Sequence, residues 1–185
     1  MRFGLLFVLI SISMTPLTLS AKSLSQEAQK FKRQYDALKL KQYDARLQIA
    51  YLEAFPSDAR TFNRLFNHPR QEQLWDGNQY IFELESLAVK HPQKTFALVL
   101  KLAAQLTWQK DAPNYLQFVL MKIAIDNPFE FSKQFSALSD PERQSIVTYL
   151  TTSANGPAVG YRQLIEILKR INKGAIAAEL AAGLK

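Results

Sequence analysis

The chain has 185 residues and carries 23 lysines and arginines against 16 aspartates and glutamates, so its formal net charge is +7. It contains no cysteine, which excludes disulfides, catalytic thiols, cysteine-bound metals and a lipid anchor attached to a cysteine. Residues 22–185 are enough for one domain with its own hydrophobic core.

The first 21 residues, MRFGLLFVLISISMTPLTLSA, have the layout of a secretory signal peptide. Arg2 is the positive start, residues 3–12 form an apolar run, and small residues at the end offer a cleavage site. The run is shorter than the ~20 apolar residues that a membrane span needs, so we favour cleavage over an anchoring helix. We therefore expect a signal peptide over residues 1–21 and a single domain over residues 22–185. The expected location is the periplasm, and secretion beyond the cell is the alternative.

The rest of the sequence has the spacing of amphipathic helices, and no stretch alternates convincingly between apolar and polar residues. The apolar positions predict a first helix over about 25–54, with a break near Leu40, and a last helix from Tyr161 that the alanine-rich tail prolongs. Between them we expect six helices, which start near Ser57, Gly77, Pro92, Pro113, Pro128 and Ser139. The predicted fold class is all-α, with about seven to eight helices.

Three of these helices carry more specific predictions. Phe62 and Phe66 should face inward from the short helix that follows Ser57. The helix that starts near Pro113 is apolar on most of its sides, so we expect it to be the central and most buried element. Ser139 and Glu142 match a capping box, in which each side chain satisfies a free backbone amide of the helix start.

Two segments 36 residues apart repeat one another. Residues 77–92 and 113–128 share five identities in sixteen positions. The matched pairs are Asn78 and Asn114, Phe82 and Phe118, Leu84 and Leu120, Ala88 and Ala124, and Pro92 and Pro128. A period near 36 residues with two helices in each unit is typical of helical-hairpin repeats. We therefore expect stacked helical hairpins, either a short α-solenoid-like array or an irregular helical bundle, with Phe82 and Phe118 buried at equivalent positions.

Three segments resemble an uncharacterised group of small exported all-helical proteins from bacteria. They are YLEAFPSDARTFNRLF at 51–66, NYLQFVLMKIAIDNPFEF at 114–131 and ALSDPERQS at 137–145. The resemblance covers residues 51–145, about half of the expected mature chain. It implies an exported helical protein, and it brings no activity and no catalytic residue to this sequence.

No motif for metal or nucleophile chemistry stands out. His68 and His91 each precede a proline at an expected helix end, so we interpret both as surface connectors. Residues 76–78 match a fragment of a calcium-binding loop but lack its other ligands. Trp75 and Trp108 lie at junctions between helices, where a tryptophan either anchors a partner or fills the seam. No residue is therefore predicted as catalytic, cofactor-binding or metal-binding.

The carboxylates also give no acid–base motif. Glu83 and Glu85 lie about 200° apart around a helix, so they cannot act together from one segment. A carboxylate pair can still assemble through the fold, as it does in glycosidases. Sequence alone leaves that alternative open.

The excess positive charge lies at the ends of the expected mature chain. Residues 22–46 carry seven basic and three acidic residues, and residues 161–185 carry five and two. Such ends can attract anionic envelope components weakly, and the alternative is an ordinary solvated helix face. No recognition-helix or stacking motif supports binding to nucleic acid.

These observations favour an exported, non-catalytic module without a cofactor that binds another protein. An envelope adaptor and an immunity-like protein are the two forms that we expect of it. The alternative is an envelope hydrolase that acts on peptidoglycan or glycans through a carboxylate pair. Stacked helix pairs present an extended surface, and the catalytic motifs are missing, which is why binding is preferred.

Overall fold

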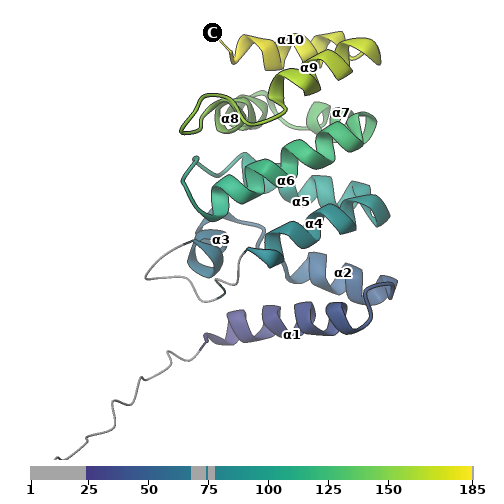
Figure 1. The fold of residues 1–185 in the computed structure, drawn as a ribbon, viewed down its shortest axis with the longest axis vertical. Coiled ribbons are helices and arrows are strands. Elements are labelled where there is room, and N and C mark those ends of the chain that lie inside the picture. Colours follow the sequence, from purple (N-terminus) through teal and green to yellow (C-terminus); the bar gives the residue numbers. More distant parts are fainter. Residues whose placement is uncertain (1–23, 68–73, 75–77, 185) are drawn as a thin grey trace, which may run out of the picture.

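The computed structural model describes residues 24–67, 74 and 78–184, and these residues form ten α-helices and no strand (Figure 1). In chain order the helices are α1 (Gln26–Leu40), α2 (Ala45–Ala54), α3 (Ala59–Phe66), α4 (Gln79–Lys90), α5 (Pro92–Ala103), α6 (Ala112–Asp126), α7 (Pro128–Ser136), α8 (Asp140–Thr151), α9 (Tyr161–Arg170) and α10 (Gly174–Ala182). The predicted all-α class is confirmed. The expected signal peptide, His68 and Trp75 lie outside the described residues. Within the described residues, no helix combines the length and apolar character that a membrane crossing requires.

The described residues contain more helices than the seven to eight predicted, and one of the extra helices arises near the N-terminus. The helix predicted over 25–54 breaks near Leu40, as expected, and its two parts are the separate helices α1 and α2. The backbone N–H of Lys41 closes α1 by donating to the carbonyl of Leu38 at 3.1 Å. The carboxylate of Asp44 then caps α2 by accepting from the backbone N–H of Arg46 at 2.9 Å. Because an aspartate at this position satisfies free amides, the chain starts a new helix directly after the turn.

The second extra helix is α10, which forms from the tail that was expected to prolong the helix from Tyr161. The chain reverses at Asn172, which adopts a left-handed backbone conformation with φ of 60°. Asparagine tolerates this conformation better than most residues do. The Tyr161 hydroxyl donates to the carbonyl of Leu180 at 2.7 Å and fixes α10 against α9. The tail is therefore a packed helix of its own.

The helices lie one above another along the long axis of the molecule (Figure 1). Helices α4, α6 and α9 pack in succession on one side, and α2, α5 and α7 do so on the other. The turns α1–α2, α4–α5, α6–α7 and α9–α10 all lie at the right-hand edge in Figure 1. The longer α5–α6 and α8–α9 connections lie at the opposite edge, together with α3 and α8. The stack thus has one edge of short turns and one edge of longer loops.

Helix α6 is the central element, as predicted. It packs against α3, α4, α5, α7 and α9, and nine of its fifteen residues are buried. The inward faces of Phe62 and Phe66 on α3 are also confirmed, since both side chains are at most 1% exposed. The Glu142 carboxylate accepts from the backbone N–H of Ser139 at 2.9 Å, which confirms the capping box at the start of α8. Bonding to Ser139 lowers the pKa of Glu142.

The predicted burial of Phe118 is wrong. Its side chain is 48% exposed, and Phe82 is only half-buried. The two rings lie 6.1 Å apart, edge to face, on the open side of the α4–α6 pair. The matched residues Leu84 and Leu120 are fully buried, so the repeated segments do present equivalent faces to the core. The phenylalanines lie on a face that no further helix of the described residues covers.

Candidate functional site

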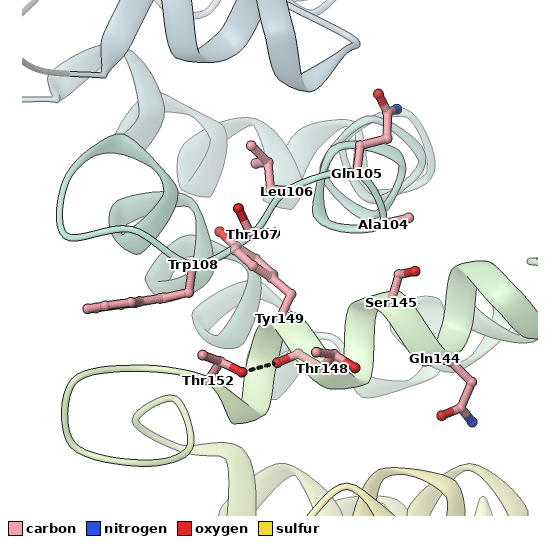
Figure 2. Close-up of a pocket in the computed structure, with 10 residues that line it drawn as sticks. All are labelled: Ala104, Gln105, Leu106, Thr107, Trp108, Gln144, Ser145, Thr148, Tyr149 and Thr152. Carbon is pink, nitrogen blue, oxygen red and sulfur yellow. Dashed lines mark hydrogen bonds between the residues drawn. The ribbon is translucent and has the colours of Figure 1, made fainter.

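A groove opens at the loop edge of the stack, between the α5–α6 connection and α8 (Figure 2). Its volume is about 490 Å³. Gln105, Thr107 and Trp108 line one wall, and Ser145, Thr148 and Thr152 line the other. Figure 2 shows the α5–α6 connection above the gap and α8 below it, with Gln105 pointing away from α8 and the hydroxyl of Thr152 bonded to the carbonyl of Thr148 at 2.8 Å.

A second hollow of about 520 Å³ adjoins the first. It lies between the start of α6, where Asn114 and Gln117 line it, and residues 153–159 of the α8–α9 connection. Trp108 lines both hollows. We call the two together the Trp108 groove, because the half-buried indole stands where they meet.

The indole of Trp108 is held in place by the helix that follows it. Its Nε1 donates to Oδ1 of Asn114, in the first turn of α6, at 3.2 Å. The connection itself is tied to α3, because the amide of Asn67 donates to Oε1 of Gln109 at 2.5 Å. The Oε1 of Gln105 accepts from the backbone N–H of Ala59 at 3.3 Å. Trp108 is therefore presented from an anchored loop.

Buried bonds between α6 and α8 form the floor of the groove. The amide of Gln117 donates to the carbonyls of Tyr149 at 2.6 Å and of Thr152 at 3.0 Å. The hydroxyl of the buried Tyr149 donates to the carbonyl of Pro113. Burial raises the pKa of Tyr149 far above its ordinary value, so this phenol keeps its proton. Tyr149 is a structural donor and is unsuited to act as a base.

The lining of the groove is neutral apart from Lys110 in the second hollow. In the described part of the chain, the residues that line it include no aspartate, glutamate or histidine. Hydroxyl and amide side chains both donate and accept hydrogen bonds, so they match neutral polar groups of a ligand. General acid–base catalysis needs a titratable group in reach of the ligand. The Trp108 groove is therefore suited to bind a ligand with neutral polar groups.

Two carboxylates, Glu85 and Asp126, line the same cavity of about 200 Å³ between α4 and α6. We call it the Glu85 cavity. Burial raises the pKa of Glu85, Lys122 opposes that rise, and Asp126 adds to it. The carboxylate of Asp126 accepts from the ammonium of Lys122 at 2.5 Å, so its charge is neutralised locally.

The other polar candidates from the sequence lie apart from both sites. The Nε2 of His91 lies 2.8 Å from Oε1 of Gln48, which agrees with a connecting role at the helix end. Glu83 forms an ion pair with Lys39 at 3.0 Å. Within the described residues, no three metal-binding side chains gather in one place.

Trp108 is recognisable in the sequence as a residue at a helix junction, whereas the residues that build the groove with it are not. Thr148 and Thr152 lie some forty residues further along the chain, and only the fold brings them near. Gln117 carried a usable signal, since it is a polar residue within the largely apolar sequence of α6. A buried amide in such a helix needs hydrogen-bond partners, and here they lie on α8.

No family model, no curated protein and no solved structure matches this chain. The similarity of residues 51–145 to small exported helical proteins therefore stays a prediction. Function has to be inferred from the Trp108 groove, the Glu85 cavity and the exposed surface of an all-α protein.

Proposed function

We propose that the protein is a non-catalytic binding module of the bacterial envelope whose Trp108 groove holds an extended segment of another protein. One observation carries this proposal. An indole fixed by Asn114 stands between two open hollows lined by neutral hydroxyl and amide groups. An adaptor and an immunity-like protein both need such a surface.

The chemistry of the groove suits a polypeptide in extended conformation. Such a segment has backbone N–H and C=O groups without partners, and the hydroxyl side chains of Thr107 and Thr148 can pair with either kind. Trp108 adds a large apolar contact of the type that dominates the binding energy of protein interfaces. Apart from Lys110 the lining is neutral, which favours a largely uncharged stretch of the partner.

The stacked arrangement of the helices belongs to the same proposal. We interpret α4–α5 and α6–α7 as repeated hairpins of a short α-solenoid-like array, because Pro92 and Pro128 each start the second helix of a pair. In such an array the loops between successive hairpins gather at one edge. The Trp108 groove lies at that edge, where α3 and α8 add their own residues.

The Glu85 cavity supports a second candidate, an envelope hydrolase that acts on glycans through Glu85 and Asp126. A carboxyl with a raised pKa that shares a cavity with a second carboxyl resembles the acid of a glycosidase and its partner. Two facts count against it. A cavity of about 200 Å³ lies below the ~300–1,000 Å³ of most ligand sites, and Lys122 already engages Asp126.

Site-specific photo-crosslinking in the native envelope tests the binding proposal. A photoreactive residue in place of Thr148, which is exposed within the groove, should capture one partner protein reproducibly. The same residue in place of Ser86, exposed on α4 outside the groove, is the control and should not capture that partner. Equal capture from both positions, or none from Thr148, would contradict the proposal.

The hydrolase candidate makes a separate prediction. Replacement of Glu85 by glutamine should then lower glycan cleavage by ~10²–10⁴-fold while the fold is kept. A binding module predicts no cleavage by the wild-type protein and no effect of Glu85→Gln on partner capture. Incubation with purified peptidoglycan and analysis of the released fragments decides between the two.

A further inference from the structure

The short turns of the stack form a surface of their own, separate from the Trp108 groove. The α1–α2, α4–α5, α6–α7 and α9–α10 turns lie at one edge, opposite the α5–α6 and α8–α9 connections (Figure 1). We call residues 39–44, 89–94, 125–130 and 169–174 the turn edge. Neighbouring helix layers pack ~8–10 Å apart, so the turns succeed one another along the long axis.

Exposed apolar side chains collect on the turn edge. Six large hydrophobic residues are exposed in the described part of the chain. Four of them lie on the turn edge, with exposed fractions of 86% for Leu40, 83% for Tyr43, 75% for Val89 and 61% for Phe129. Single exposed apolar residues are common on protein surfaces. Their concentration on successive turns of one edge points to a surface that is covered in function.

Three of the four turns are basic, whereas the α6–α7 turn, which carries Phe129, contains Asp126 and Glu130 and no basic residue. The four ranges of the turn edge contain seven lysines and arginines against three aspartates and glutamates. Part of this excess has a structural cause, because cations stabilise the C-terminal ends of helices such as α1, α4 and α9. Lys41, Lys90 and Lys173 are exposed and form no ion pair with any described residue. Their charges are thus available to an anionic partner.

We propose that the turn edge docks the protein on the surface of an anionic phospholipid bilayer. The charge balance selects the partner, since basic residues near a membrane surface are attracted by anionic headgroups. Leu40 and Phe129 supply apolar groups for the boundary between headgroups and acyl chains. Tyr43 is of the type enriched at that depth, because its ring is apolar and its hydroxyl is polar.

The arrangement of the exposed apolar residues on the turn edge favours a membrane over a second protein as the partner. The exposed apolar residues stand on three separate turns that follow one another along the edge. Leu40 and Tyr43 lie on the α1–α2 turn, Val89 on the α4–α5 turn and Phe129 on the α6–α7 turn. A bilayer presents a continuous surface that all three turns can meet together. A protein partner would need a matching hollow for each turn. This inference is independent of the proposed function of the Trp108 groove, which lies at the other edge of the stack (Figure 1).

Flotation with lipid vesicles tests the inference. The purified protein is mixed with vesicles of phosphatidylethanolamine alone or of phosphatidylethanolamine with phosphatidylglycerol, and only the anionic vesicles should carry it. A variant with Leu40→Ser and Phe129→Ser should partition at least about tenfold less, since two apolar anchors are lost. Val159→Ser is the matched control, because Val159 is 84% exposed but lies on the α8–α9 connection. It should bind as the wild type does.

Two charge variants complete the test. Lys41→Glu and Lys90→Glu should weaken binding to the anionic vesicles, and added salt should weaken the binding of the wild type. Absence of wild-type binding to anionic vesicles would overturn the inference. Equal partition of the wild type and of the variant with Leu40→Ser and Phe129→Ser would also overturn it. The turn edge would then be better explained as a binding surface for a protein.

A labelling experiment gives an independent readout. The chain has no cysteine, so Tyr43→Cys introduces a unique site for an environment-sensitive fluorophore. Its emission should shift to the blue when anionic vesicles are added, because the probe enters a less polar region. The same fluorophore at Val159→Cys should not shift. Shifts at both positions, or at neither, would contradict docking through the turn edge.

Discussion

Truncation of Phe131 should destabilise the protein far more than truncation of Phe118, although both are large aromatic residues of neighbouring helices. Phe131 is 0% exposed, and its ring lies 5.3 Å from that of Phe135 and 6.3 Å from that of Phe96. A phenylalanine in such a setting loses both its transfer free energy and its packing when it becomes alanine. We therefore expect Phe131→Ala to lower the free energy of unfolding by about 3–5 kcal/mol.

Phe118 is 48% exposed, so only about half of its surface leaves water on folding. Full burial of such a side chain contributes about 1.5–3 kcal/mol, and half of it gives roughly 1 kcal/mol. No closed cavity remains after its truncation, because the open side of α4 and α6 is already in contact with solvent. The two variants should thus differ by at least about 2 kcal/mol.

Urea and thermal unfolding followed by circular dichroism measure both changes. At about 2–4 °C per kcal/mol for a chain of this size, Phe131→Ala should lower the Tm by roughly 6–20 °C and Phe118→Ala by roughly 2–4 °C. Equal losses from the two truncations would refute the placement of Phe118 on an uncovered face. A Phe131→Ala variant with nearly the stability of the wild type would refute the burial of Phe131 in the core.

Two further predictions concern bonds that position α3 and α8. Tyr149→Phe removes the donor to the Pro113 carbonyl and leaves that buried oxygen unpaired, so it should cost about 1–3 kcal/mol in urea unfolding; a loss under about 0.5 kcal/mol would contradict the bond. Asp58 caps α3 by accepting from the backbone N–H of Thr61 at 2.9 Å, and this bond holds the pKa of Asp58 below its ordinary value. The stabilisation is therefore complete above the unfolded pKa, near about 4, and is lost as the pH falls through the lower folded value. Asp58→Ala should lower the free energy of unfolding by about 1 kcal/mol at neutral pH and by progressively less in acid. A difference between the two proteins that does not change with pH would contradict the cap.

Several helices were predictable because their start signals are local. Pro92 and Pro128 each occupy the first turn of a helix, and Ser139 with Glu142 forms the expected box. These signals act within one turn of the chain, so the sequence displays them directly. Asp44 is a signal of the same kind, and it accounts for the break that was predicted near Leu40, where α1 ends.

The burial of single residues was less predictable, because it depends on which layers cover a helix. The periodicity of α6 marks Phe118 as apolar, yet it cannot tell whether a neighbouring helix lies on that side. The same limit applies to the alanine-rich tail, whose helix gains its place from the Tyr161 bond to Leu180. Tertiary contacts decide such cases, and they join residues far apart in sequence.

Only one residue of the candidate site, Trp108, could be recognised from the sequence. Trp108 lies at a junction between helices, where the sequence pattern changes from apolar to polar. Thr148 and Thr152 look like ordinary surface residues of α8, since nothing local shows that they face Trp108. Their role follows from the packing of α8 on α5 and from the bonds that Gln117 makes across to α8.

The affinity of the captured partner for three variants tests the central claim most directly. Calorimetric titration of the partner against Trp108→Ala should give a Kd at least about 30-fold above that of the wild type, which corresponds to the ~2 kcal/mol of a hot-spot residue. Phe129→Ala, at the turn edge, and Glu85→Gln, in the small cavity, should leave the Kd within about twofold. Unchanged affinity for Trp108→Ala, or its loss in Glu85→Gln, would contradict a binding module that works through the Trp108 groove.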